Sequence, residues 1–196
     1  APPSSAPAPQ LPDVPARHVA HVLDERLASR GDETALRYRV DGTWREISWK
    51  ELSARVRDLS SALVDAGVGE GDRVAILAAN RPEWTIADLA ILRVRGVSVP
   101  IHVTSSAAQV AFILKDSGAR LAFADPGEPL ASATAALGSA TGLERVVVFG
   151  DVPPGDDRVT GFAGLLARGR SAGREPEVAA RLARATPDDL LTLLYT

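Results

Sequence analysis

The chain has 196 residues, of which 45% are hydrophobic and 24% charged, proportions that are ordinary for a globular protein. Because 22 Lys and Arg stand against 25 Asp and Glu, the formal net charge is −3, and no basic excess favours a nucleic-acid partner. The absence of Cys excludes disulfides, thiolate metal sites and cysteine nucleophiles, and no apolar run of about 18 residues predicts a membrane span.

The amino-terminal region predicts an arm followed by a helix. Residues 1–15 are rich in Pro, Ala and Ser, and they lack the basic and apolar regions of a secretory signal. We therefore expect a flexible arm over 1–15, a folded part over 16–196, and a cytoplasmic protein. Apolar residues at helical spacing predict the first helix over 17–29, and Gly31 ends it.

Two alternating runs, TALRYRV and TWREISW, come next, and Asp41-Gly42 joins them. Asp-Gly between alternating runs is a strong signal for a β-hairpin. Ser48 and Glu51 then form a capping box, which predicts a helix that ends at Gly67. The glycines of GVGEGD lie between this helix and a strand, whereas a dinucleotide fingerprint lies between a strand and a helix, so they predict a loop.

Residues 74–149 alternate between apolar strands and helices. Asn80 is expected to cap the helix after the first of these strands, and Gly96 is expected to end that helix. Pro100 indicates that the second strand lies at an edge or that the proline stands at the end of the strand. The predicted strands are 74–79, 97–101, 120–124 and 144–149.

The last part of the chain gives weaker signals. Residues 151–161 predict a loop, a short helix starts at Phe162, and a further helix covers 175–185. The ending DDLLTLLYT, residues 188–196, predicts a buried strand. Chain ends usually lie in exposed segments, so this pattern indicates either an edge strand or a chain cut within a domain.

The order of these elements predicts the fold class. Successive β-then-α units imply parallel strands joined by right-handed crossovers. Continuous apolar runs such as VVVF fit strands that are covered on both faces. We expect an α/β fold with an open, mostly parallel sheet flanked by helices, and a β-hairpin near the amino terminus.

The loops after the strands carry few motifs for chemistry. None has the paired glycines of a nicotinamide or flavin site, and neither a G-x-S-x-G elbow nor a Walker A motif occurs. His102 and Thr104 follow the second of these strands and are candidates for an active-site loop, although an ordinary loop histidine that caps a carbonyl is the simpler reading. Asp125 could bind a hydroxyl, but Asp-Pro-Gly indicates a turn first. His18 and His21 have a spacing that could hold a metal, yet no third ligand accompanies them, so no metal site is expected.

The blocks GDRVAIL, NRPEW, VPIHVTSSAAQV and DSGAR, with the ending DDLLTLLYT, are informative together. They resemble the amino-terminal portion of adenylate-forming (AMP-binding) acyl-CoA synthetases and are most similar to the long-chain fatty acid branch. The resemblance covers residues 16–150 well and 151–185 loosely, and it resumes in 188–196. Within the loop after the second strand, the residues that match this branch are His102, Thr104, Ser105, Ser106 and Gln109.

The resemblance implies that residues 16–196 form the amino-terminal portion of the adenylation domain of a larger two-domain enzyme, ending just before its phosphate-binding loop. Such a ligase uses ATP, Mg²⁺ and coenzyme A, first to convert a fatty carboxylate to acyl-AMP and pyrophosphate and then to form the thioester. Tyr195 and Thr196 match nucleotide-binding positions, whereas no catalytic or metal-binding residue is matched. We therefore expect this chain alone to be inactive and to bind none of these cofactors well.

Two alternatives stay open beside this interpretation. One is an acyl-AMP ligase or a loading domain of a polyketide or peptide synthetase, and the other is a noncatalytic stand-alone binding module. The implied partner is a fatty acid, with peripheral membrane association left open and neither nucleic acid nor a transmembrane segment expected. An exposed apolar final strand also predicts that the chain self-associates.

Overall fold

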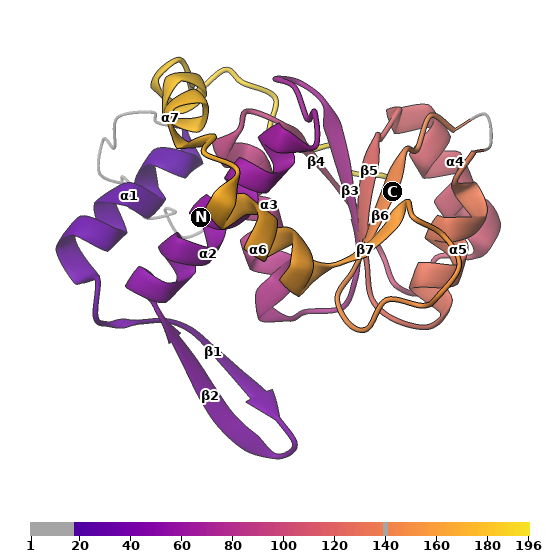
Figure 1. Cartoon of the computed structure of the whole chain (residues 1–196), viewed down its shortest axis with the longest axis horizontal. Coiled ribbons are helices and arrows are strands. Elements are labelled where there is room, and N and C mark those ends of the chain that lie inside the picture. Colours follow the sequence, from indigo (N-terminus) through magenta and orange to yellow (C-terminus); the bar gives the residue numbers. More distant parts are fainter. Residues whose placement is uncertain (1–17, 139–140) are drawn as a thin grey trace, which may run out of the picture.

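The computed structural model describes residues 18–138 and 141–196, so the predicted arm over 1–15 lies outside the described residues. Figure 1 shows a central sheet between two groups of helices, with a hairpin that projects from one end. The helices are α1 Val19–Arg30, α2 Trp49–Asp65, α3 Pro82–Arg93, α4 Ala107–Ser117, α5 Glu128–Ala136, α6 Phe162–Ser171 and α7 Glu175–Ala183. The strands are β1 Thr34–Val40, β2 Thr43–Ser48, β3 Arg73–Leu77, β4 Val97–Ile101, β5 Leu121–Ala124, β6 Arg145–Val148 and β7 Val159–Gly161.

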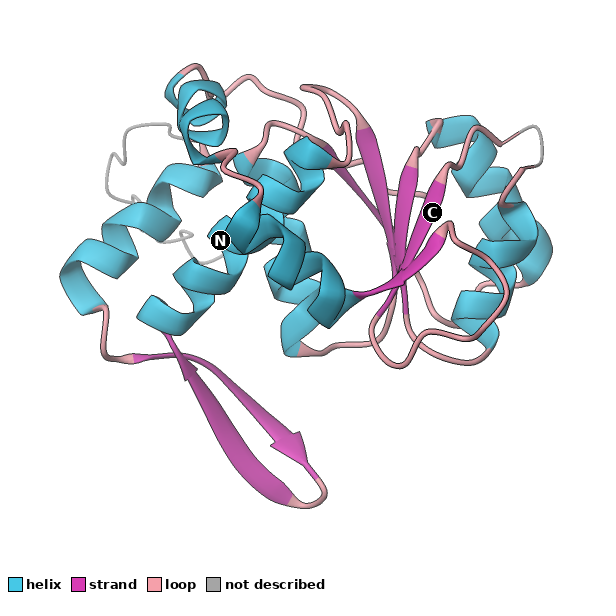
Figure 2. Cartoon of the chain, viewed as in Figure 1, coloured by secondary structure: helices cyan, strands magenta, loops and turns pink. Residues whose placement is uncertain are grey.

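The main sheet has the strand order β4-β3-β5-β6-β7, and every neighbouring pair is parallel (Figure 2). The predicted α/β fold class is therefore confirmed, and β4, which contains Pro100, lies at the end of the strand order as expected. From β3 the chain moves to one side to form β4 and then to the other side to form β5. Because both crossovers are expected to be right-handed, this reversal places α3 and α4 on opposite faces of the sheet.

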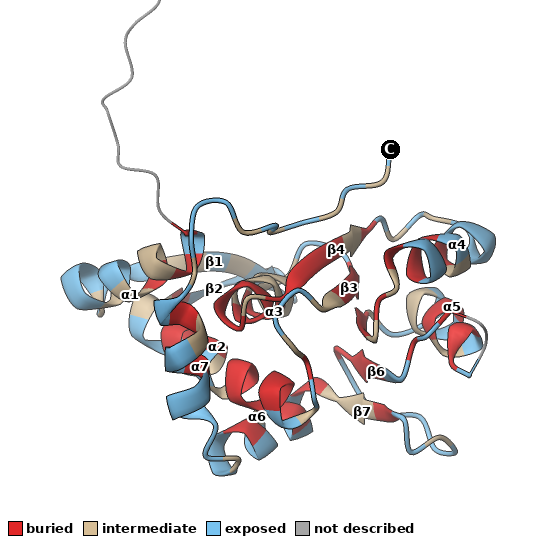
Figure 3. Cartoon of the chain, turned by 90° about the horizontal axis from the view of Figure 1, so that it is seen from above, coloured by how far each residue is buried: buried red, intermediate tan, exposed pale blue. Residues whose placement is uncertain are grey.

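Side chains of β3 alternate between two cores. Val74 and Ile76 pack with the core formed by α2, α3 and α6, whereas Ala75 and Leu77 pack with α4 and α5, and all four are at most 2% exposed. Figure 3 shows buried residues on helices that face the sheet from both sides. Burial on both faces explains the continuous apolar strands. Within the described residues, no helix has the length and apolar character needed to cross a membrane.

Helix α2 is central to the larger core. It begins at the predicted capping box, in which the Ser48 hydroxyl accepts from the Glu51 amide and the Glu51 carboxylate accepts from the Ser48 amide. Leu59 and Leu63 are fully buried on its inner face. Where α6 crosses α2, an added Cβ at Gly169 would lie 1.8 Å from the Asp58 carbonyl oxygen, so only glycine permits this close packing.

The predicted hairpin forms from β1 and β2, which make a separate antiparallel sheet. Asp41 and Gly42 at its turn have φ angles of 48° and 77°, as a two-residue turn with positive φ at both positions requires. The hairpin projects from the body of the molecule (Figure 1), and Trp44 near its tip is 63% exposed.

The start of α3 differs from the sequence expectation. Asn80 does not cap this helix; the N-cap is Arg81, which has an extended backbone and makes no side-chain cap. The cause is Pro82, since a proline disfavours the helical conformation of the residue before it and so fixes the boundary one residue later than expected.

The end of α3 also differs. Gly96 was expected to end the helix, but the helix ends at Arg93 and the left-handed residue is Arg95, with a φ of 59°. Gly96 is needed for space, because an added Cβ would lie 3.2 Å from the Ile91 carbonyl oxygen and 3.3 Å from that of Asp72. The sequence therefore predicted the wrong residue for the left-handed turn, which is Arg95 and not Gly96.

Two further expectations in the last part of the chain are corrected. Strand β7, Val159–Gly161, lies within the predicted loop 151–161 and is too short for a hydrophobic pattern to reveal. The predicted final strand over 188–196 is instead an extended segment with an isolated parallel bridge between Thr192 and Ser98 of β4. Beyond this bridge the segment contacts α4, where the Tyr195 hydroxyl donates to Asp116.

We expect Gly169→Ala to lower the free energy of unfolding by more than about 2 kcal/mol, because α2 and α6 must move apart to admit a methyl group. The matched control is Gly164→Ala in the same helix, where no heavy atom lies within 4 Å of the added Cβ. This control should leave stability unchanged or raise it by up to about 1 kcal/mol. Urea unfolding followed by circular dichroism measures both, and equal midpoints would contradict the packing described above.

Candidate functional site

A crevice of about 710 Å³ opens at the carboxyl ends of β3 and β5. One wall is the outer edge of β1 in the hairpin, and the other is the segment 79–85 at the start of α3, with Asp125 at its side. The reversal of strand order lies between these same two strands. Ligands of open α/β sheets bind where the chain reverses direction in this way, so the crevice is the first candidate site.

Arg81 and Asp125 connect the two loops that border the crevice. The Arg81 Nη1 donates to Asp125 Oδ1 at 2.7 Å, its Nε donates to Glu83 at 2.8 Å, and its guanidinium lies 5.3 Å from the centre of the Phe149 ring. The second Asp125 oxygen accepts from the Ala79 amide at 2.7 Å. Asp125 thus does more than form the turn that its sequence indicates: it holds the end of β3 against the end of β5.

The hairpin adds two guanidinium groups and an aromatic ring to the crevice wall. Arg37 pairs with Glu46 at 2.8 Å, Arg39 donates to the Gly42 carbonyl at 3.0 Å, and Trp44 lies exposed beside them. These groups suit recognition of a polar ligand that carries negative charge. In the part of the chain that the structure describes, the crevice wall holds no nucleophile paired with a base.

His102 and Thr104 contact each other in the turn after β4. The His102 Nδ1 lies 2.7 Å from the Thr104 hydroxyl and accepts from the Thr104 amide at 3.3 Å. An accepting Nδ1 leaves the proton of the neutral ring on Nε2. The simpler interpretation of the sequence expected the ring to cap a backbone carbonyl. In the structure the ring accepts from a backbone N–H instead. Neither residue lines the crevice, and their role at an active site stays a prediction.

Tyr195 and Thr196 lie at the end of the segment that runs along β4. The Ser98 amide donates to the Leu191 carbonyl at 2.9 Å and the Leu193 amide donates to the Ser98 carbonyl at 3.0 Å, so the segment runs parallel to β4 towards the carboxyl edge of the sheet. The Tyr195 hydroxyl donates to Asp116 of α4 at 2.8 Å. Burial and this hydrogen bond raise the pKa of Tyr195. Thr196 is exposed.

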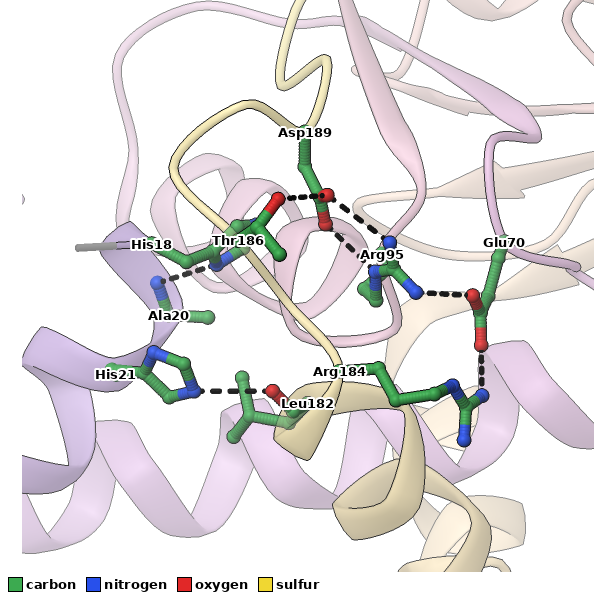
Figure 4. A network of polar contacts seen from close by, with 9 residues as sticks. All are labelled: His18, Ala20, His21, Glu70, Arg95, Leu182, Arg184, Thr186 and Asp189. Carbon is green, nitrogen blue, oxygen red and sulfur yellow. Dashed lines mark hydrogen bonds and ion pairs between the residues drawn. The ribbon is translucent and has the colours of Figure 1, made fainter. Parts of the chain in front are cut away.

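A network of polar side chains holds the start of the same segment (Figure 4). Arg95 donates to both oxygens of Asp189, at 2.7 and 3.1 Å, and to Glu70 at 2.5 Å. The Thr186 hydroxyl donates to Asp189 at 2.9 Å, and Arg184 contacts Glu70. Hydrogen bonding to Arg95 lowers the pKa of Asp189 to about 2.

His18 and His21 border this network but do not point to a common ligand (Figure 4). The His18 Nδ1 accepts from the Ala20 amide at 3.2 Å, and the His21 Nε2 lies 3.1 Å from the Leu182 carbonyl. Burial lowers the pKa of His18, and the charge of Asp189 opposes that shift. Among the described residues, no three His, Asp or Glu side chains are grouped so that they could hold a metal ion.

Sequence reasoning missed the crevice, the Arg81–Asp125 pair beside it, and the Arg95–Asp189 pair at the opposite, amino edge of the sheet. Arg81 and Asp125 are 44 residues apart, and Arg95 and Asp189 are 94 apart, so no local pattern links them. The available signal was the position of Asp125 directly after a predicted strand. No sequence pattern indicated Arg95 as the partner of Asp189, because the neighbouring Gly96 was expected to form the turn at the end of α3.

Known proteins resemble this chain in sequence. The family model described as AMP-binding enzyme matches residues 23–196. The long-chain-fatty-acid–CoA ligases FadD15 of Mycobacterium bovis and of Mycobacterium tuberculosis are each 36% identical to this chain over 181 residues. These matches cover 91% of this chain and 29% of each relative, so the chain spans less than a third of the length of these relatives.

The fold also matches a solved structure, that of the anthranilate CoA ligase AuaEII in complex with anthranoyl-AMP. The TM-score is 0.78 with 24% sequence identity, and the match covers 94% of this chain and 33% of the other. At this identity the likeness supports the fold, and it extends over almost all of the present chain.

The Arg95–Asp189 pair predicts a dependence of stability on pH. Because the pKa of Asp189 falls to about 2 in the folded state, the pair contributes stability above the unfolded value of about 3.9, and this stability is lost as the pH falls through about 2. We expect the carboxyl carbon of Asp189 to titrate near pH 2 in NMR spectra of the folded chain. In the urea-unfolded chain the midpoint should rise to about 3.9. Equal midpoints in both states would show that the pair does not form.

Proposed function

Because this chain belongs to the family of AMP-binding enzymes, which confirms the resemblance found in its sequence, we propose that it is the amino-terminal part of an ATP-dependent long-chain fatty acid–CoA ligase. The observation that carries the proposal is the 36% identity to the two FadD15 ligases over 181 residues, which extends through the whole sheet. Residues 16–196 would then form the first portion of the adenylation domain and end just before its phosphate-binding loop.

The proposed reaction has two steps. A carboxylate oxygen of the fatty acid attacks the α-phosphorus of ATP, an acyl–phosphate bond forms, and the bond to pyrophosphate breaks. The thiol of coenzyme A then attacks the acyl carbonyl and gives up its proton to the solvent, a C–S bond forms, and the C–O bond to AMP breaks, so that AMP leaves with the bonding electrons. Both steps develop negative charge on oxygen, which cationic groups or Mg²⁺ stabilise in such reactions.

The contribution of this chain to that reaction would be positioning. Thr196 ends the segment that runs along β4, and its exposed hydroxyl and amide are the donors that the segment would offer to a phosphate. The Tyr195 hydroxyl donates to Asp116, and its contact with a nucleotide stays part of the proposal. Mg²⁺ is commonly held by one or two carboxylates together with the phosphates of the substrate, so its ligands in this reaction would include the phosphates of ATP.

Two features of the carboxyl edge support binding on this side of the sheet. The crevice beside β1 carries guanidinium groups of Arg37, Arg39 and Arg81, and the turn with His102 follows β4, the neighbour of β3. A phosphate or carboxylate of a substrate would take the place of the carboxylates that now pair with Arg37 and Arg81.

ATP–pyrophosphate exchange tests the proposed function. A longer protein that contains these 196 residues should exchange pyrophosphate in the presence of a sixteen-carbon fatty acid. The 196-residue chain alone should give no exchange above background, because in this proposal it would end just before the phosphate-binding loop. Exchange by the 196-residue chain alone would contradict the proposal that this chain is inactive without the rest of the protein.

The same assay separates the alternatives. If acyl-AMP forms but coenzyme A does not release AMP, while the phosphopantetheine thiol of a carrier protein does, the protein is an acyl-AMP ligase or a loading domain. If the longer protein gives no exchange with any carboxylic acid but binds a fatty acid, the chain belongs to a noncatalytic binding module.

A further inference from the structure

Arg95 has a backbone conformation that its side chain disfavours. Its φ of 59° is left-handed, in a turn between the end of α3 and the start of β4. Glycine adopts this conformation freely, whereas residues with a Cβ rarely do. A non-glycine residue in such a conformation is held by its surroundings, and its side chain is the first place to look for a role.

The Arg95 side chain connects three separated parts of the chain. It donates through two nitrogens to Asp189 of the segment 188–196 and through a third to Glu70, which Arg184 also contacts (Figure 4). The side chains of Arg95 and Asp189 are only 21% and 14% exposed. A bidentate, partly shielded arginine–carboxylate pair fixes both distance and orientation, which a lysine could not do equally well.

The segment 188–196 has few backbone contacts that fix its position along β4. They are the two hydrogen bonds of the Ser98 bridge, with Leu191 and with Leu193. Leu193 and Tyr195 pack against the core that α4 and α5 cover, whereas Leu190 and Leu194 are 58% and 70% exposed. Burial therefore selects which face of the segment turns inward, but a shift by two residues would keep the same faces.

The side-chain contacts supply the missing specification. Asp189 lies three residues before Thr192, the residue of the bridge, and Tyr195 lies three residues after it. Arg95 holds the first and Asp116 holds the second. A slip by one residue would break both contacts and turn each side chain to the other face.

We propose that Arg95 is a positioning residue whose ion pair with Asp189 sets the register of the segment 188–196 on β4 and thereby the location of Thr196. The role of Thr196 towards phosphate rests on the proposed function, whereas the register itself does not. The left-handed turn directs the guanidinium from the start of β4 onto the segment.

Three variants of the 196-residue chain test the register. Arg95→Gly removes the guanidinium and suits the left-handed backbone, so it does not add strain. Asp189→Asn removes the charge from the other partner. Arg184→Ala is the matched control, because it removes an arginine from the same network that does not contact Asp189.

Hydrogen exchange of individual amides provides the readout. The Leu193 and Ser98 amides donate across the bridge, whereas the Asp125 and Phe149 amides donate between strands β3, β5 and β6 and report on the main sheet. We expect Leu193 and Ser98 to exchange roughly tenfold faster in Arg95→Gly and in Asp189→Asn, with Asp125 and Phe149 unchanged and with Arg184→Ala like the parent chain.

Two results would overturn the positioning role. Unchanged exchange at Leu193 in Arg95→Gly would show that the segment keeps its register without the ion pair. Equal acceleration at all four amides would show that Arg95 supports the stability of the whole sheet and has no specific effect on the segment.

The consequence for catalysis is measured separately, in a longer protein that contains this chain. Arg95→Gly should raise KM for ATP several-fold and leave KM for the fatty acid unchanged. Faster exchange at Leu193 combined with an unchanged KM for ATP would confirm the register and contradict the role of Thr196 in nucleotide binding. The two parts of the proposal therefore fail in different ways.

Discussion

The parallel sheet must be covered on both faces, and most of the structure depends on this constraint. Strand β3 contributes Val74 and Ile76 to one core and Ala75 and Leu77 to the other, so helices are required on each side. The chain meets this requirement by forming β4 on one side of β3 and β5 on the other. The reversal leaves the carboxyl ends of β3 and β5 uncovered between helices of opposite faces, and the crevice opens there.

The same edge of the sheet collects the polar features of the molecule. Arg81 and Asp125 close the base of the crevice, the turn of His102 follows β4, and the segment 188–196 runs beside β4 towards this edge. The segment is held by side chains more than by backbone, because the isolated bridge at Ser98 gives it only two inter-strand hydrogen bonds. The main sheet and α4 thus hold the segment 188–196 in place although it has few backbone hydrogen bonds to β4. Binding sites are commonly built in this way, from loops held by a rigid scaffold.

Sequence patterns predict the local structure well wherever the cause is local. The capping box of Ser48 and Glu51 and the Asp41-Gly42 turn both form as expected, because each depends on neighbours within a few residues. Asn80 does not cap α3, because Pro82 places the start of this helix one residue later. This effect could have been predicted, since Pro82 is visible in the sequence. The left-handed Arg95 was not expected, since the glycine beside it is the residue type that this conformation favours. The Arg95 and Gly96 amides donate to the Leu92 and Ile91 carbonyls and so close the end of α3 in this conformation. The crevice and its ion pairs could not be predicted either, because they join residues that lie far apart in the sequence.

The central claim is that the carboxyl edge of this sheet is the side of the molecule on which adenylation takes place. The most direct measurement is a crystal structure of a longer protein containing this chain, bound to a non-hydrolysable acyl-adenylate analogue. The account predicts an adenylate phosphate within hydrogen-bond distance of Thr196, at the carboxyl edge of the sheet. An adenylate bound at the amino edge, or one that leaves Thr196 exposed, would contradict it.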